Sequence, residues 1–493
     1  MPSRIPVTIL LFLLSCRWTP AQVKEPQVVG IHQAESEYYS SIYRNSMPPG
    51  EISPEKPVML KSRKDGEPAF MVYGWHPYWA TSTAFIYYDY DVLTHIAHFS
   101  YEVDTATGSY TTIRGWDTTP LISYAHQRGV KVMLTVTNFG SERNTSILTD
   151  TIKQWTLINT VTSLLKSRSG DGVNFDFEVV PASMKANMVD FCRRAVRGIK
   201  TELPQAEISL ATPAVNWSDG WDLQALAEIC DYLIMMGYNY YWSGSSTAGP
   251  VAPLAGENYN ITRSIREDYL DEGVPGSKLL LGMPWYGYDW PVTGSARKAA
   301  TTGTGTSRTY ISTINLVASH GKTFDSQTSV PWMSYQSGTQ WRQMWFEDSL
   351  SLLLKANYAK TGNLAGVGIW ALSYEAGRPE LWNGLKAVIA GTVSSDDNPA
   401  LPGSGGNEIL SINPNPVTDR ALVSYSTERQ GRVTISVIDA GGRLAKVITD
   451  GIAPPGIHTE TIVKDGLLPG IYFCVLNTPG GRSVKRFAVA ENK

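Results

Sequence analysis

The sequence predicts an α/β fold, a closed (β/α)8 barrel over residues 70–390, followed by a small β-sandwich over residues 408–493. Eight near-continuous apolar runs alternate with helical stretches in the first region, which is typical of a parallel sheet covered by helices. The first run leads directly into Trp75 and His76 instead of a Gly-rich phosphate loop, so a barrel is favoured over an open nucleotide-binding sheet. Beyond residue 408, short alternating strands separated by Gly-rich turns are typical of a sandwich.

The elements of the barrel can be placed along the chain from its hydrophobic pattern. The eight strands are expected at residues 71–75, 95–101, 131–137, 172–178, 207–212, 232–238, 279–284 and 366–372. Long helices are expected at residues 151–167, 182–201 and 348–360. The stretch 291–340 is rich in Thr, Ser and Gly, and we expect it to form only a short or degenerate insertion between the last two strands.

The first 21 residues are typical of a secretory signal peptide, with an apolar run too short to span a bilayer and a cleavage site after Ala21. Leu13 to Cys16 also fits a lipoprotein box, in which Cys16 would be acylated. Residues 22–69 are polar and Pro-rich, and we expect a lead-in strapped across the barrel with one short helix near 35–43. Residues 391–407, rich in Ser, Pro and Gly, predict a flexible linker.

The composition excludes one class of partner. The chain has 42 Lys and Arg residues against 45 Asp and Glu residues, and with no basic excess we expect no nucleic-acid partner. Its 15 Trp and 25 Tyr residues suit either a sugar-binding protein or a large aromatic core. The four Cys residues are too widely spaced to indicate a disulfide framework or zinc cluster, and we expect Cys192, Cys230 and Cys474 to be buried thiols.

The fourth predicted strand carries the candidate chemistry. Polar and apolar residues alternate from Asp171 to Glu178, so Asn174, Asp176 and Glu178 lie on the inner face, about 6.6 Å apart along the strand. Two buried carboxyls are costly unless they are paired, which favours a functional role over an internal polar network. Glu178 lies at the C-terminal end of the strand, where barrels carry their reactive groups. With Asp176 able to share a hydrogen bond, one carboxyl should keep its proton and serve as a general acid.

The run from Asp171 to Glu178 resembles the DxxDxDxE signature of glycoside hydrolase family 18, the chitinases and their relatives, whose catalytic domain is a TIM barrel. Similarity to this family continues over residues 70–390. The further segments that carry it are Met236 to Asn239 on the sixth strand, Gly282 to Gly287 on the seventh and Gly368 to Trp370 on the last.

This resemblance implies a retaining hydrolysis without an enzyme nucleophile and without a cofactor. Glu178 would protonate the glycosidic oxygen and later activate water as a base. The 2-acetamido group of the substrate would attack the anomeric carbon, while Asp176 orients that group and Tyr238 hydrogen-bonds its oxygen. The substrate must then carry N-acetylhexosamine at the cleaved bond, as chitin, peptidoglycan and the N-glycan core do.

Two positions depart from the family pattern. Asn174 replaces an Asp, which removes a charge beside Asp176, although the amide could still hydrogen-bond Asp176; this form is similar to the branch that contains spore-cortex peptidoglycan hydrolases. Asn239 replaces an Asp next to Tyr238, which is expected to alter subsite preference. Besides Asn174 and Asn239, the residues expected to bind substrate are Trp75, Met236, Tyr286 and Trp370, the last as a floor on which a sugar stacks.

Further aromatic and histidine side chains lie in or near the predicted strands. Aromatic residues gather at predicted strand ends and are expected to line a cleft; besides those just named they are Trp79, Tyr240, Tyr241, Trp242 and Trp285. His76, His95 and His98 match no metal-ligand spacing, so we expect histidines of the core or rim and no metal.

Residues 408–493 resemble the C-terminal sorting domain of the type IX secretion system. The order of motifs carries this resemblance: Asn413 to Pro416, Asp439 to Arg443, then Leu468 to Tyr472. It implies that the type IX machinery is a partner and that the chain crosses the periplasm and outer membrane to become secreted or surface-bound. A carbohydrate-binding sandwich is the alternative, but its few rings, expected mainly in the core, argue against it; they are Tyr425, Tyr472, Phe473 and Phe487.

Three functions therefore remain open. The first is a monomeric glycosidase acting on polysaccharides or glycans that contain N-acetylglucosamine. The second is a lectin-like relative that binds such sugars without cleaving them, and the third is a surface scaffold or adhesin. Loss of the acid marks the lectin-like relatives, so the presence of Glu178 favours the enzyme. Chitin, peptidoglycan and, for an endo-β-N-acetylglucosaminidase, N-glycans all remain candidate substrates.

Overall fold

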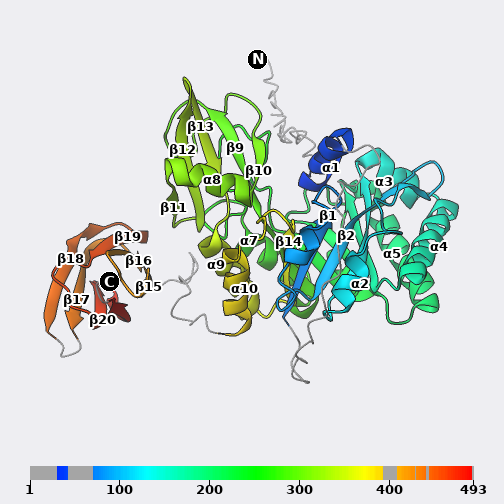
Figure 1. The fold of residues 1–493 in the computed structure, drawn as a ribbon. Coiled ribbons are helices and arrows are strands. Elements are labelled where there is room, and N and C mark those ends of the chain that lie inside the picture. Colours follow the sequence, from blue (N-terminus) through cyan, green and yellow to red (C-terminus); the bar gives the residue numbers. More distant parts are fainter. Residues whose placement is uncertain (1–29, 43–69, 392–407, 428, 440–442, 491–493) are drawn as a thin grey trace, which may run out of the picture.

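The computed structural model describes residues 30–42, 70–391, 408–427, 429–439 and 443–490. The predicted signal peptide, the lipoprotein box at Cys16 and the predicted linker beyond residue 391 lie outside these ranges. Figure 1 shows the described chain as a large α/β body and a separate body of strands. No helix in the described ranges combines the length and apolar character needed to cross a membrane.

Eight parallel strands close into a barrel, as the sequence predicts. Because β1 pairs with both β14 and β2, the sheet has no open edge between its first and last strands. A short strand, β3 (Tyr110–Thr112), extends β2 in the antiparallel direction. The barrel strands are β1 (Met71–Pro77), β2 (His95–Val103), β4 (Lys131–Phe139), β5 (Gly172–Glu178), β6 (Glu207–Pro213), β7 (Tyr232–Met236), β8 (Leu279–Pro284) and β14 (Gly366–Trp370).

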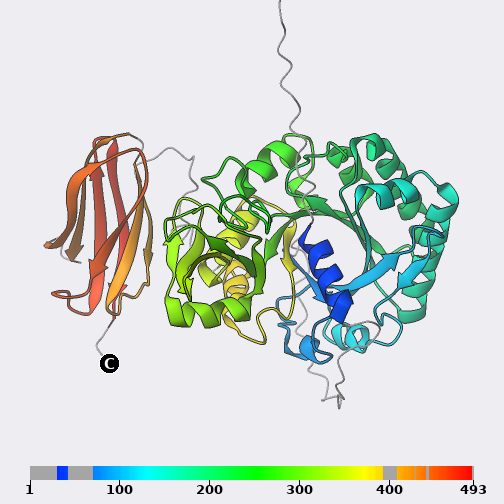
Figure 2. The ribbon, with the colours of Figure 1, turned by 90° about the horizontal axis from the view of Figure 1, so that it is seen from above.

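Helices follow most of the strands and cover the barrel (Figure 2). Helix α4, the second helix after β4, is one example. The Asp150 side chain caps it by accepting from the N–H groups of Ile152 and Lys153, and one face of the helix is buried. The helices around the barrel are α2 (Leu121–His126), α3 (Ser141–Leu148), α4 (Thr151–Arg168), α5 (Lys185–Glu202), α6 (Leu223–Ile229), α7 (Ile261–Arg263), α9 (Ser349–Thr361) and α10 (Glu380–Ile389). Short helical turns are η1 (Ala84–Tyr87), η2 (Ala182–Met184), η3 (Ser264–Leu270) and η4 (Gly276–Lys278).

The insertion between β8 and β14 is complete, so the prediction of a short or degenerate one is wrong. Its antiparallel sheet has the order β10-β9-β13-β12-β11. Composition misled the prediction because a buried charge organises this sheet: Asp289 accepts from Tyr335 Oη at 2.8 Å and from Arg342 Nε at 2.9 Å. The elements are β9 (Tyr286–Val292), β10 (Thr306–Thr309), α8 (Tyr310–His320), β11 (Thr323–Asp325), β12 (Val330–Ser337) and β13 (Gln340–Trp345).

Among the described residues before the barrel, 30–42, there is one helix. It is α1 (Ile31–Ile42), which begins and ends earlier than the predicted helix at 35–43. Figure 2 shows α1 between the barrel strands and the insertion. Contacts at both sides agree with this view, since Ser307 of β10 donates to Glu35, and Arg114, just after β3, donates to Ser40. The N-terminal lead-in therefore places a helix at the barrel mouth.

The C-terminal residues form the predicted β-sandwich. One sheet has the order β15-β16-β19 and the other β18-β17-β20-β21. Their apolar core is separate from that of the barrel and contains Tyr425, Tyr472 and Phe487, as expected. The strands are β15 (Glu408–Asn413), β16 (Arg420–Thr427), β17 (Gly431–Asp439), β18 (Leu444–Ala453), β19 (Gly456–Val463), β20 (Gly470–Thr478) and β21 (Gly481–Val489).

The three cysteines in the described ranges, Cys192, Cys230 and Cys474, are buried free thiols, in agreement with the sequence-based expectation.

Candidate active site

Three polar side chains of β5 point into the barrel. Asn174 and Asp176 are fully buried and Glu178 is 6 % exposed. The alternate side chains face outward, where Phe175 and Phe177 pack against Phe191 of α5 at ring distances of 5.1 and 5.3 Å. The strand period of two thus separates a polar inner row from an apolar outer row.

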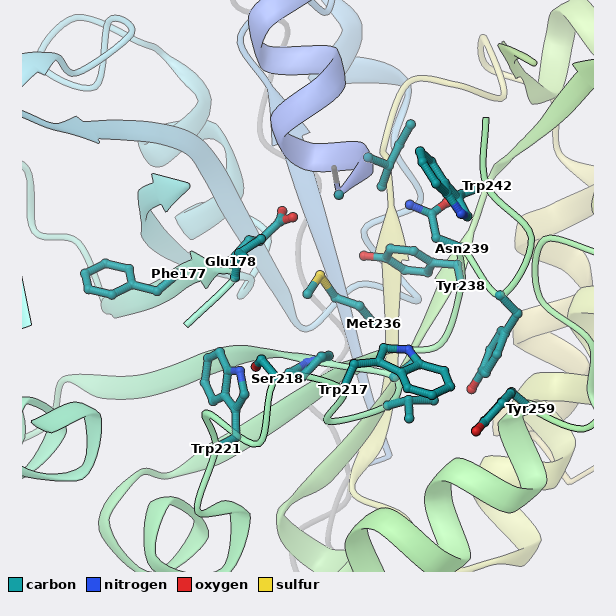
Figure 3. Close-up of a pocket in the computed structure, with 17 residues that line it drawn as sticks. Phe177, Glu178, Trp217, Ser218, Trp221, Met236, Tyr238, Asn239, Trp242 and Tyr259 are labelled. Atoms are coloured by element: carbon teal, nitrogen blue, oxygen red, sulfur yellow. The ribbon is translucent and has the colours of Figure 1, made fainter. Parts of the chain in front are cut away.

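Glu178 lies at the C-terminal end of β5, on the wall of a cavity (Figure 3). Its backbone carbonyl accepts from Gly140 N at 3.0 Å and from Asn144 Nδ2 at 2.6 Å, which fixes the strand end against α3. Burial, and after it the nearby Asp176 carboxylate, raise the pKa of Glu178 well above its ordinary value. This carboxyl therefore keeps its proton to a higher pH than an ordinary Glu side chain does.

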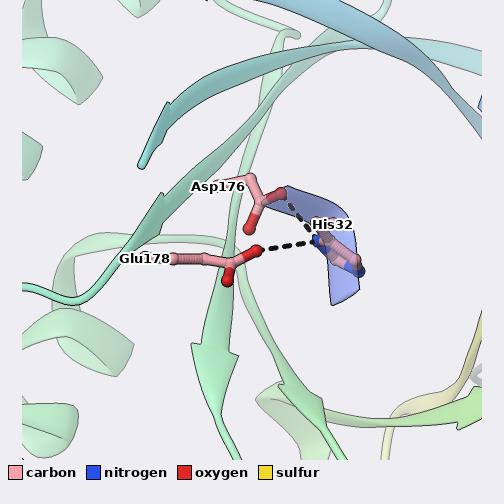
Figure 4. A group of neighbouring side chains, drawn as sticks. All are labelled: His32, Asp176 and Glu178. Atoms are coloured by element: carbon pink, nitrogen blue, oxygen red, sulfur yellow. Dashed lines mark hydrogen bonds and ion pairs between the residues drawn. The ribbon is translucent and has the colours of Figure 1, made fainter. Parts of the chain in front are cut away.

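The partner of Asp176 is a residue that the sequence did not indicate. Oδ2 of Asp176 lies 2.7 Å from Nδ1 of His32, the second residue of α1, and the other ring nitrogen of His32 lies 2.8 Å from the Tyr238 hydroxyl. His32 Nδ1 is also 3.6 Å from Oε1 of Glu178 (Figure 4). The expected hydrogen bond between Asp176 and Glu178 is absent from the bonds found among the described residues, because Asp176 turns toward the imidazole.

Asn174 does not hydrogen-bond Asp176, contrary to expectation. Its Oδ1 accepts from Trp75 Nε1 at 3.0 Å, and its Nδ2 donates to Ser209 Oγ of β6 at 3.0 Å. Trp75 is itself fully buried. Asn174 therefore fixes an indole ring and a neighbouring strand beneath the carboxyl groups.

The last residue of β7 and the residues after it form the wall of the cavity opposite Glu178. Tyr238 is 4 % exposed, and burial raises its pKa well above the ordinary value, so its hydroxyl remains protonated. Tyr286 donates to Oδ1 of Asn239 at 2.6 Å, which orients the amide beside Tyr238. Met236, Tyr238 and Asn239 line the same cavity as Glu178 (Figure 3).

Trp370 lies at the end of β14 and is fully buried. The His32 ring stacks on it with centroids 3.7 Å apart and planes inclined by 30°. Its indole N–H donates to Oε2 of Glu35 at 2.9 Å. Trp75 lies deeper, with its ring 5.6 Å from that of His32. Trp370 is thus fully buried beneath α1, and its role as a floor on which a sugar stacks stays a prediction.

The open part of the site is a cavity of about 520 Å³. Trp217 and Tyr259 lie on its rim with ring centroids 4.3 Å apart, and Trp217 is 51 % exposed. Sequence reasoning missed these two residues and Trp221; the rule that strand-end loops build the cleft, applied to the loop after β6, indicates Trp217 and Trp221. Of the aromatic residues expected at the cleft, Tyr240 and Trp242 line it, whereas Trp285 packs against Trp382 of α10.

The sequence predicts that three histidines, His76, His95 and His98, do not bind a metal, and each hydrogen-bonds another group; His98 Nε2 lies 3.1 Å from the carbonyl oxygen of Arg114. His95 bonds Glu207 at 2.8 Å, His76 bonds Tyr88 at 2.6 Å, and burial lowers the pKa of His76 to about 3 and that of His98 to about 4. The ligand atoms of His32, Asp176 and Glu178 do lie within 4.8 Å of one another. The short contact of His32 Nδ1 with Asp176 is a hydrogen-bond distance, which fits an N–H donor rather than a metal-bound nitrogen.

Two family models match the chain. Residues 70–375 match "Glycosyl hydrolases family 18", and residues 411–490 match "Secretion system C-terminal sorting domain". The second match indicates export from the cell or to its surface.

Similar proteins include a putative sporulation-specific glycosylase of Bacillus subtilis (27 % identical, over 50 % of this chain and 59 % of that protein) and a probable di-N-acetylchitobiase of Dictyostelium discoideum (27 %, 61 % and 82 %). A cortical fragment-lytic enzyme of Bacillus subtilis is 24 % identical over 59 % of this chain and 66 % of its own length. The chain therefore spans less than two thirds of the two Bacillus proteins.

Solved structures share the barrel fold. A chitinase of Cycas revoluta in complex with (GlcNAc)3 superposes with a TM-score of 0.58 at 18 % identity, over 66 % of this chain and 100 % of the other. A Chromobacterium violaceum chitinase gives 0.55 at 24 % identity, over 65 % of this chain and 99 % of the other.

Proposed function

Because the chain belongs to glycosyl hydrolase family 18, we propose that it is a secreted, retaining glycosidase that cleaves β-1,4 bonds in glycans containing N-acetylglucosamine, either chitin or peptidoglycan. The observation that carries this proposal is the buried Glu178 carboxyl, which has a raised pKa and lies on the wall of an aromatic-lined cavity. A positioned acid of this kind contributes about 10²- to 10⁴-fold to the rate of bond cleavage. A sugar-binding relative without activity would have no need of it.

The surroundings of Glu178 support catalysis assisted by the substrate itself. Asp176 Oδ2 and the Tyr238 hydroxyl face one small space from two sides and hold the two nitrogens of a single ring there. The same two groups suit an acetamide, whose N–H donates to a carboxylate and whose oxygen accepts from a phenol. In the proposed reaction the acetamide oxygen attacks the anomeric carbon, Glu178 gives its proton to the leaving oxygen, and Glu178 then takes a proton from the incoming water.

Two features support chitin and peptidoglycan as the substrate classes. The aromatic rim formed by Trp217, Tyr259 and Trp242 offers flat surfaces on which sugar rings can stack. The similar proteins include both di-N-acetylchitobiases and cortical fragment-lytic enzymes. The sorting domain supports a route across the periplasm and outer membrane through the type IX machinery.

The test is a product analysis with chitin oligosaccharides, peptidoglycan strands and an N-glycan core peptide side by side. We expect cleavage of one of the first two, with the β-anomer released first and seen by NMR before mutarotation. A thiazoline mimic of the cyclised acetamide should inhibit competitively. Release of the α-anomer, or no inhibition by the thiazoline, would refute the substrate-assisted mechanism; exclusive cleavage of the N-glycan core would overturn the substrate class.

A further inference from the structure

We propose that α1 is an intramolecular occupant of the sugar site, so that the chain is autoinhibited until α1 leaves the barrel mouth. This inference rests on the proposed function, since it assigns to α1 the place that the N-acetyl sugar takes next to Glu178.

The buried face of α1 is polar, which is unusual for a helix that packs on a barrel. Besides Ile31, the buried residues of α1 are His32, Glu35 and Ser36, whereas Tyr38 and Ile42 are more than half exposed. Burying such side chains is costly unless each finds a polar partner. Ile31 joins the apolar core, whereas the partners of His32 and Glu35 are side chains around the carboxyl groups of β5, so the polar part of this face complements the site.

His32 reproduces the hydrogen bonds and the stacking expected for an acetamido sugar. Since a carboxylate only accepts, the ring presents an N–H to Asp176 at 2.7 Å, and its second nitrogen faces the Tyr238 hydroxyl at 2.8 Å. One flat face of the ring lies 3.7 Å from Trp370. An imidazole and an acetamide cannot occupy this position at the same time.

Glu35 occupies a second group of donors. Its carboxylate accepts from Trp370 Nε1 at 2.9 Å, from the Tyr374 hydroxyl at 2.5 Å and from Ser307 Oγ of the insertion at 3.1 Å. Barrel and insertion therefore offer three convergent donors to one oxygen-rich group. The hydroxyls of a sugar ring are the other oxygen-rich groups that could use these donors.

The chain before α1 lies directly against the acid. A β-carbon added to Gly30 would lie 1.5 Å from Oε2 of Glu178, so only a residue without a side chain fits between α1 and the carboxyl. Gly30 and Ile31 also form part of the wall of the open cavity. A glycosidic bond cannot reach Glu178 from this side while Gly30 is in place, whereas the aromatic rim at Trp217 stays accessible.

The far end of α1 makes part-buried contacts with the barrel. Ser40 Oγ lies 2.9 Å from the Tyr78 hydroxyl and accepts from Arg114 Nη2 at 2.5 Å, and Tyr39 stacks on Trp79 at 4.7 Å. The barrel is closed by its own strands without α1. The helix can therefore leave without opening the sheet, and its covalent link to β1 keeps its local concentration high.

The fraction of molecules in which α1 has left the site sets the size of the inhibition. If the open state is a minor one, populated at about 0.1–10 %, the apparent affinity for a sugar falls by the same fraction. Weakening α1 should therefore raise kcat/KM by about 10- to 1000-fold. Because the inhibition is intramolecular, diluting the protein should not relieve it.

The test uses the full chain and two double variants. His32→Ala/Glu35→Ala removes the buried contacts, and the matched control Gln33→Ala/Glu37→Ala removes two polar side chains that pair with each other on another face of α1. We expect kcat/KM on N-acetylglucosamine oligosaccharides to rise about tenfold or more in the first variant and to stay within about twofold in the control. An unchanged kcat/KM in the first variant would overturn the proposal. A fall would also overturn it, because it would make His32 part of the turnover machinery.

A binding measurement separates this inference from the proposed function. In a Glu178→Gln background, calorimetry with the same oligosaccharide should show a tighter Kd after His32→Ala/Glu35→Ala, by a factor similar to the gain in kcat/KM. A tighter Kd with no turnover in any variant containing Glu178 would keep the autoinhibition and refute the glycosidase. Turnover with no gain in either readout would keep the glycosidase and refute the autoinhibition, and absence of both binding and turnover would refute both.

Discussion

Replacing Asn174 by Asp tests whether the inner row of β5 (Asn174, Asp176 and Glu178) is as completely buried as the structure indicates. The Asn174 amide donates to Ser209 Oγ and accepts from Trp75 Nε1, and the side chain is fully buried. An Asp at this position would lose the donor and place a third carboxyl beside Asp176 and Glu178, with no cation among the side-chain bonds that Asn174 makes. Losing a buried hydrogen bond and burying an unpaired acid costs about 2–4 kcal/mol.

The pH dependence of this cost has a definite sign. Burial would raise the pKa of the new carboxyl in the folded state above its unfolded value of about 3.9, so the unfolded chain ionises first as pH rises. The destabilisation therefore grows between the two pKa values by about 1.4 kcal/mol per pH unit and shrinks on acidification. The part of the cost that comes from ionisation should be largest near neutral pH and nearly absent at about pH 4, where only the loss of the hydrogen bond remains.

The assay is urea unfolding of the wild type and of Asn174→Asp at several pH values, with Asn159→Asp as the control. Asn159 is exposed on α4, so the same chemical change there should alter stability by no more than about 0.5 kcal/mol. If Asn174→Asp were as stable as the wild type at neutral pH, with no dependence on pH, the described burial of the inner row would be wrong.

Three further predictions concern other parts of the molecule. Turnover should fall as pH rises through the raised pKa of Glu178, because the acid must be protonated, and a pH profile of kcat/KM with a basic limb at the ordinary carboxyl pKa would contradict this. Asp289→Asn should destabilise the insertion by about 3–5 kcal/mol in urea unfolding, because it leaves Arg342 without its buried partner, and an unchanged midpoint would show that the pair is dispensable. Trp217→Ala should raise KM about tenfold with kcat nearly unchanged, because the exposed ring only stacks on sugar, and an equal loss in kcat would show a role in the transition state.

The strands of the barrel were predictable because each is a nearly continuous apolar run, and β5 and β8 end at the predicted residues. The row of Asn174, Asp176 and Glu178 was predictable for an equally simple reason, the strand period of two. The insertion was not, since its sheet depends on the buried Asp289 and its long-range partners instead of on local hydrophobicity.

Long-range contacts also explain what was missed at the site. Nothing in the sequence near His32 shows that its ring lies against Asp176, which is 144 residues away. The partners of Asn174 lie on two other strands, so its predicted bond to Asp176 could not be judged from spacing along β5 alone. Helix α1 was expected as part of a polar lead-in, and only its tertiary contacts reveal which surface it covers.

The most direct measurement of the central claim is turnover after Glu178→Gln in the His32→Ala/Glu35→Ala background, with Glu375→Gln as the control. Glu375 is a buried carboxyl that bonds Trp382 of α10, so its loss reports on removal of a buried acid alone. We predict that Glu178→Gln lowers kcat by about 10²-fold or more while oligosaccharide binding persists, and that the control keeps most of its activity. Near-full activity without the Glu178 carboxyl would contradict the account.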